Sequence, residues 1–148
     1  MRYIELDTPA LLIDRERLTK NLKDMQSYAD AHGVALRPHT KTHKCPEIAK
    51  MQLAAGACGI AVAKVGEAEA MAEAGLDDRF IGNEIVGEAK LRRIAALAKR
   101  GVKLAFGVDT PCQVTAAESV FAQEGVSVPV LVEIEVGENR SGVIEEAD

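Results

Sequence analysis

Apolar residues recur at two different spacings along the chain, and the two spacings alternate. Between residues 14 and 33 they return every three or four positions, which is the spacing of one face of an α-helix. Short continuous apolar runs follow at regular intervals. We expect these runs to be strands buried on both faces, as in a parallel sheet. They cover residues 34–39, 58–65, 79–85, 102–109 and 128–136.

Helical patterns lie between these runs. They cover residues 45–56, 66–75, 87–101 and 110–125. Pro46 and Pro111 stand where a first helical turn accepts proline, and Gly56 stands where a helix ends. A further apolar run at residues 8–14 opens the chain. The sequence therefore predicts an opening strand and helix, followed by five strands separated by four helices.

This alternation predicts an α/β fold, either a doubly wound open sheet or a (β/α)8 TIM barrel. A barrel needs eight strand–helix units and typically ~250 residues. The 148 residues supply about five units, so we expect either an open five-stranded sheet or the N-terminal part of such a barrel. No glycine-rich phosphate loop follows the first strand, which disfavours a nucleotide-binding open sheet.

Composition and charge exclude several classes of partner. The net charge of −5 and the pI of about 5.3 disfavour nucleic acid, which requires a basic face. No apolar run approaches the ~20 residues of a membrane span. The three cysteines are widely spaced and form no C-x-x-C pair, so we expect neither a disulfide framework nor a metal site. The acidic start is unlike a signal peptide, and we expect a cytoplasmic protein.

Candidate chemistry gathers where the first expected strand ends. Residues 37–44 hold three of the eighteen Lys and Arg residues and two of the three His residues. In parallel α/β folds this end of each strand carries the site. Neighbouring cations disfavour a protonated lysine, and a neutral lysine amine attacks carbonyl groups to form Schiff bases. Pyridoxal phosphate would use both the amine and the cations. The alternative is a basic loop that pairs with acidic neighbours.

Five segments, in order and over nearly the whole chain, resemble the N-terminal half of the D-threonine aldolase and D-serine dehydratase family. They read TPALLID, LRPHTKTHKCPEIA, GIAVAKVGEAEAMAEAG, NEIVG and VEIEVGENRSGV. These proteins are fold-type III pyridoxal phosphate enzymes with an alanine-racemase-like barrel. The RPHxKTHK block is the most specific of the five matches. On this resemblance we expect residues 1–148 to be a partial barrel domain, with the last barrel strands and a C-terminal β-domain lying elsewhere.

The resemblance also implies roles for individual residues. Lys41 would form the Schiff base with pyridoxal phosphate, and Arg37 and His39 would shape the site around it. Arg140, in the VxVGxxRxGV pattern, would sit near the phenolic oxygen of the cofactor. His43 would either hydrogen-bond another site residue or contact the substrate.

The implied activity is a lyase acting on D-3-hydroxy amino acids, by aldolase cleavage of the Cα–Cβ bond. A D-serine or 3-hydroxy-D-aspartate dehydratase, a non-catalytic pyridoxal phosphate carrier and an open-sheet binding module are the alternatives. The family places a divalent metal on ligands of its C-terminal domain, and none is expected on this chain. The resemblance further implies a homodimer, and residues 1–148 alone are expected to be inactive.

Overall fold

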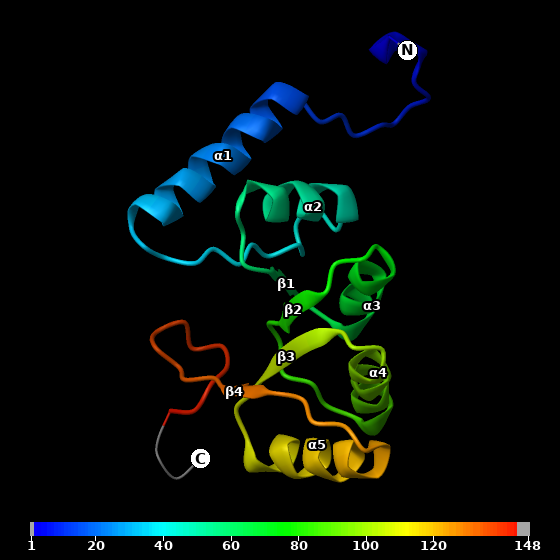
Figure 1. Cartoon of the computed structure of the whole chain (residues 1–148), viewed down its shortest axis with the longest axis vertical. Coiled ribbons are helices and arrows are strands. Elements are labelled where there is room, and N and C mark those ends of the chain that lie inside the picture. Colours follow the sequence, from blue (N-terminus) through cyan, green and yellow to red (C-terminus); the bar gives the residue numbers. More distant parts are fainter. Residues whose placement is uncertain (1, 145–148) are drawn as a thin grey trace.

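Strands and helices alternate along the chain in the computed structural model, which describes residues 2–144 (Figure 1). A 3-10 helix at Tyr3–Glu5 precedes the main elements. The helices are α1 (Arg15–Ala31), α2 (Pro46–Ala55), α3 (Val65–Glu73), α4 (Glu88–Lys99) and α5 (Pro111–Glu124). The strands are β1 (Ile60–Val62), β2 (Asp78–Ile81), β3 (Lys103–Val108) and β4 (Val130–Val132). None of the described helices is both long and apolar enough to cross a membrane.

The strands form one parallel sheet in the order β1-β2-β3-β4, so each strand pairs with the next along the chain. Helices α3, α4 and α5 line one side of this sheet (Figure 1). The core lies between the two layers, where Ile60, Ile81 and Phe106 are fully buried. Phe106 meets Phe121 of α5 edge to face, with ring centroids 6.1 Å apart. The expected α/β architecture is confirmed.

Four strands are described where the sequence predicted about five. Residues 34–39 run alongside β1 but make only one bridge, between His39 and Ala61. Pro38 has no N–H to donate, so a regular ladder cannot form here. The segment is instead held through its carbonyls, because Leu36 O accepts from Cys58 N and Pro38 O accepts from Ala61 N.

The opening run at residues 8–14 also forms no strand. Its apolar side chains are exposed, Leu11 completely and Leu12 and Ile13 by more than 60%. The expectation of an opening strand was wrong, because no neighbouring strand lies beside this run in the described chain. Helix α1 then begins at Arg15, close to where the pattern predicted, and Oδ1 of its N-cap Asp14 accepts from the backbone N–H of Arg17.

The sheet has an open face, the side that α3, α4 and α5 do not cover. Side chains from alternate positions of the strands gather there. Phe80 and the ring of His39 both lie beside Gly82, at 3.9 and 3.7 Å from the point where a Cβ on that glycine would stand. Leu131 of β4 is 52% exposed on this face. The open face therefore includes residues of the His39 segment, β2 and β4.

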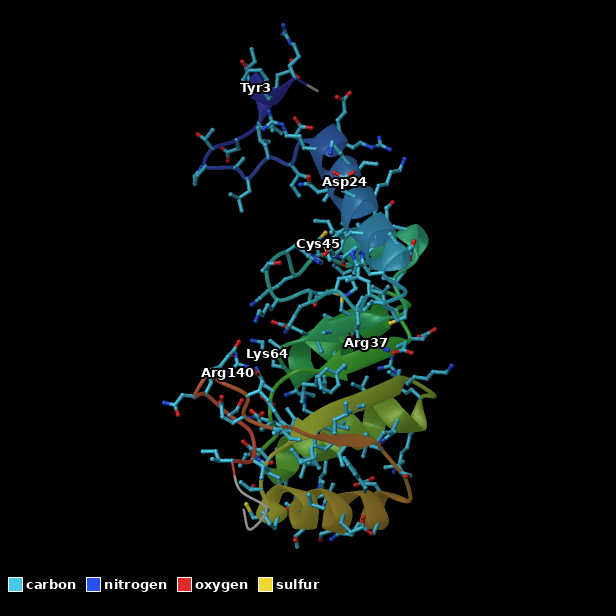
Figure 2. The ribbon with its side chains drawn as sticks, turned by 90° about the vertical axis from the view of Figure 1, so that its left-hand side faces the viewer. Tyr3, Asp24, Arg37, Cys45, Lys64 and Arg140 are labelled. Atoms are coloured by element: carbon cyan, nitrogen blue, oxygen red, sulfur yellow. The ribbon has the colours of Figure 1, made fainter. Side chains whose placement is uncertain are left out.

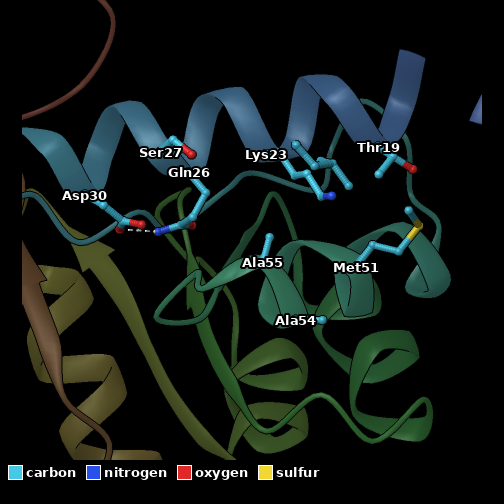
Figure 3. Close-up of a pocket in the computed structure, with 9 residues that line it drawn as sticks. Thr19, Lys23, Gln26, Ser27, Asp30, Met51, Ala54 and Ala55 are labelled. Atoms are coloured by element: carbon cyan, nitrogen blue, oxygen red, sulfur yellow. Dashed lines mark hydrogen bonds between the residues drawn. The ribbon is translucent and has the colours of Figure 1, made fainter. Parts of the chain in front are cut away.

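A cavity of about 520 Å³ lies between α1 and α2, away from the open face (Figure 3). Gln26 closes one end, where its Nε2 donates to Asp30 at 2.8 Å. The other lining residues shown in Figure 3 are mostly short or aliphatic, such as Ala54, Ala55 and Met51. None of the sequence-predicted site residues lines this cavity, so we place the candidate site elsewhere.

Candidate functional site

The turn at residues 40–44, here called the lysine turn, presents Lys41 beyond the end of the His39 segment. Its first residue, Thr40, is fully buried. Both the N–H and the hydroxyl of Thr40 donate to Ala61 O, at 2.8 and 3.2 Å. Lys44 N donates back to Thr40 O at 2.7 Å and closes the turn. Lys41 itself is exposed, so its amine is free to meet a ligand.

The two histidines of the motif use the same ring nitrogen to fix the backbone around Lys41. Nδ1 of His39 accepts from Lys41 N at 3.2 Å, and Nδ1 of His43 accepts from Cys45 N at 3.1 Å. In the neutral ring each histidine then carries its proton on Nε2. Nε2 of His43 is buried and has no hydrogen-bond partner among the described residues. Burial lowers the pKa of His39, and the charge of Lys41 lowers it further, while Glu67 raises it.

Glu84 and Glu133 form a carboxyl pair on the open face, one on each side of Gly107. Oε2 of Glu133 and Oε1 of Glu84 lie 3.4 and 3.9 Å from the point where a Cβ on Gly107 would stand. A hydrogen bond to Glu133, together with burial, raises the pKa of Glu84. The same bond, and one from the Ser141 hydroxyl at 2.8 Å, lowers the pKa of Glu133. Glu84 is therefore the member of the pair that binds a proton more readily.

Arg140 lies in a turn after β4 that Glu135 organises. The carboxylate of Glu135 accepts from several backbone N–H groups of the turn, including those of Gly137 and Arg140. These bonds lower the pKa of Glu135. The turn returns against the chain at Gly142, where a Cβ would come within 2.5 Å of Glu135 N, so only glycine fits. The Arg140 side chain is 62% exposed and 4.0 Å from Glu138.

Arg37 lies apart from these groups. Its guanidinium packs over Gly59 and donates to Oδ1 of Asp78, the first residue of β2, at 2.5 Å. Figure 2 shows Lys64 and Arg140 on the same side of the molecule, with Arg37 displaced towards the other side. The structure thus brings Lys41, His39 and His43 together at the carboxyl ends of the strands. It directs Arg37 towards the opposite, amino-terminal edge.

Two further residues of the site were not among the predicted site residues. Glu67 is only 8% exposed, and it stands in the GEAEAMAEAG segment, whose pattern predicted a helix but not the burial of this carboxylate. Glu84 sits in the NEIVG segment, whose position after a strand was its only signal. Within residues 2–144, no three His, Cys, Asp or Glu side chains are grouped so that they could hold a metal ion.

The arrangement suits chemistry on a carbonyl compound. It offers an exposed primary amine, a histidine whose pKa is lowered by burial and a carboxyl group whose pKa is raised. A neutral imidazole and a protonated carboxyl are a proton acceptor and a proton donor near neutral pH. An amine among them is a nucleophile towards an aldehyde.

Comparison with known proteins places this arrangement in a family. Residues 13–148 match the model of the alanine racemase N-terminal domain. The chain belongs to this family. The matched region of this alanine racemase N-terminal domain contains the lysine turn and all four strands of the sheet.

The relatives of this alanine racemase N-terminal domain include enzymes of D-amino acids. The chain is 46% identical to a D-threonine aldolase of Arthrobacter over 96% of its own length. It is 38% identical to a D-threo-3-hydroxyaspartate dehydratase of Delftia over 95% of its length. The crystal structure of a D-threonine aldolase from Filomicrobium marinum superposes with a TM-score of 0.89 at 44% identity, covering 93% of this chain and 37% of the other. The chain spans about 37% of the length of both curated relatives.

Proposed function

We propose that this chain is the N-terminal part of a pyridoxal phosphate-dependent lyase that cleaves the Cα–Cβ bond of D-3-hydroxy amino acids, as D-threonine aldolase does. The observation that carries the proposal is the exposed amine of Lys41 on a turn that four hydrogen-bonded backbone N–H groups hold in place. The 46% identity to a D-threonine aldolase supports the choice of reaction.

The residues present fit pyridoxal phosphate. The cofactor needs an amine for its aldehyde, and Lys41 offers an exposed one at the carboxyl ends of parallel strands. It also carries anionic oxygens. Arg140 is an exposed cation on the last strand's turn and would hold the phenolic oxygen. Arg37 is hydrogen-bonded to Asp78 at the amino-terminal edge of the sheet. It would therefore contribute to cofactor binding only indirectly, by stabilising that edge.

Bound pyridoxal phosphate would supply an electron sink for the electron pair left on Cα. The residues of this chain would then orient the substrate and handle protons. Lys41 would be the residue that binds the aldehyde of the cofactor, through its exposed amine. His39, whose pKa is lowered by burial, would accept a proton at the carboxyl ends of the strands. His43 would either hydrogen-bond another site residue or contact the substrate. Its Nε2, which has no partner among the described residues, favours the contact with substrate.

A dehydratase acting on D-serine or 3-hydroxy-D-aspartate is the second candidate, because a D-threo-3-hydroxyaspartate dehydratase is 38% identical. The two activities give different products. D-Threonine would yield glycine and acetaldehyde, whereas D-serine would yield pyruvate and ammonia. Because the chain spans about 37% of its relatives, we propose that a divalent metal and its ligands come from other segments, in a homodimeric, cytoplasmic enzyme.

The test is to incubate the protein with pyridoxal phosphate, reduce it with borohydride and map the pyridoxyl-lysine by peptide mass spectrometry. We expect the label on Lys41. The variant Lys41→Met should remain unlabelled. A label on Lys44 or Lys64 in the unaltered protein would overturn the proposed site.

A further inference from the structure

Glu67 connects two parts of the site that the chain brings together from different elements. It is a carboxylate in the first turn of α3, and its side chain is only 9% exposed. Oε2 accepts from the backbone N–H of Ala63, directly after β1, at 2.7 Å. Oε1 lies 3.4 Å from Nζ of Lys44, the last residue of the lysine turn. A buried carboxylate needs such partners, because an unpaired buried charge is strongly unfavourable.

Lys44 is the point where the lysine turn needs support. Its φ of 46° is left-handed, a conformation that a residue with a side chain holds only when its surroundings compensate. The other end of the turn is already fixed, because Thr40 is buried and bonded twice to Ala61 O. At the Lys44 end, Nδ1 of His43 accepts from Cys45 N, and the ion pair with Glu67 is the contact made by the Lys44 side chain itself.

We propose that Glu67 and Lys44 form a clamp that positions Lys41. The ion pair would hold the lysine turn against the end of β1, so that the amine of Lys41 has one location relative to the carboxyl ends of the strands. Glu67 would be a positioning residue and not a catalytic one. The inference rests on the proposed function, because it is the reaction at Lys41 that requires the amine to have one fixed location.

Capping of α3 is the competing explanation for Glu67, and the chain allows the two to be separated. Glu67→Gln keeps an oxygen that can accept from Ala63 N but removes the charge. Lys44→Met removes the same ion pair without touching α3. A clamp requires both variants to have the same effect and the double variant to add little to either. If Glu67 only caps α3, Lys44→Met should have no effect on the lysine turn.

The first measurement is hydrogen exchange of the cofactor-free protein, followed on peptides that cover the lysine turn. We expect both variants to exchange about two- to fivefold faster there, the factor that corresponds to a typical partly exposed ion pair. Peptides from α3 should be unchanged in Lys44→Met. The control is Lys50→Met, which breaks an exposed pair with Glu47 at 2.9 Å on α2 and should leave the turn unaltered.

The second measurement is the rate at which pyridoxal phosphate becomes reducible onto Lys41. We expect a decrease of similar size in both variants, with Lys44→Arg restoring most of the rate. Unchanged exchange in the turn of Lys44→Met would overturn the clamp, even if the unaltered protein is labelled on Lys41. Faster exchange together with no label on Lys41 would overturn the proposed function and leave the clamp standing.

Discussion

Arg79 of β2 gives the sharpest test of the packing described above. Its side chain is 1% exposed on the helix-covered side of the sheet, and Nε and both terminal nitrogens lack a hydrogen-bond partner among the described residues. In the strand register it stands between Ile60 and Leu104, both buried. Burial lowers the pKa of Arg79, which expresses the same cost of an unpaired buried charge. Arg79→Leu would make this row of three residues entirely apolar.

The expected effect follows from the unpaired donors. Leaving a buried polar group without a partner costs about 1–3 kcal/mol. Replacing buried ionic groups by apolar residues of similar volume is neutral or stabilising by about 1–4 kcal/mol. We therefore expect Arg79→Leu to stabilise the protein by about 2 kcal/mol. In a protein of this size that raises the midpoint of thermal unfolding by roughly 4–8 °C.

The assay is thermal unfolding followed by circular dichroism, at equal protein concentration for every variant. The control is Arg93→Leu, which removes an arginine from the exposed pair between α4 and Glu69 and should change the midpoint little. A midpoint for Arg79→Leu that falls below that of the unaltered protein, with Arg93→Leu unchanged, would show that the guanidinium has a stabilising partner in solution. The reasoning from unpaired donors would then be refuted.

Three further outcomes are expected. Arg140→Ala should lower the rate of the pyridoxal phosphate reaction about tenfold to a hundredfold, which is the effect of losing a charge-assisted hydrogen bond. Arg92→Ala, on α4, should leave the rate unchanged, and equal rates for the two variants would contradict the role of Arg140. The raised pKa of Glu84 makes its contribution to stability decline as the pH rises through that pKa. Glu84→Gln, whose amide donates to Glu133 at every pH, should flatten the dependence of the unfolding midpoint on pH above the ordinary range of a glutamate, and an unchanged slope would contradict the raised pKa of Glu84. Finally, the open face and the edge of β4 expose apolar side chains. Residues 1–148 alone should therefore elute as oligomers in size-exclusion chromatography and show no lyase activity. A monodisperse monomer would favour an open-sheet binding module.

The sequence predicted most of the helices because their ends carry local signals. Pro111 and Thr110 start α5, and Gly56 ends α2, as the pattern indicated. Residues 34–39 satisfied the apolar pattern of a strand, but Pro38 interrupts the ladder. A short apolar run shows that a segment is buried, and it does not show how its hydrogen bonds are made.

The candidate site was only partly predictable for a related reason. The RPHTKTHK motif located Lys41 and its two histidines because they are close in sequence. Arg37 belongs to the same motif, yet its partner Asp78 is 41 residues away and at the other edge of the sheet. The burial of Glu67 depends on how α3 packs against β1 and the lysine turn. Such contacts between distant segments leave no local pattern.

The open face has a consequence for how the site is assembled. Lys41 extends from the segment beside β1, and Arg140 follows β4 at the other edge of the sheet. Four strand spacings of ~4.8 Å would separate them by about 19 Å on a flat sheet, far more than one cofactor ring spans. Curling of the sheet towards its open face shortens that distance, and glycine at positions 82 and 107 on this face leaves room for it. We therefore expect a bulky residue at either glycine to weaken the site, because it would limit the curvature of the sheet and press on His39 at position 82 or on Glu84 and Glu133 at position 107.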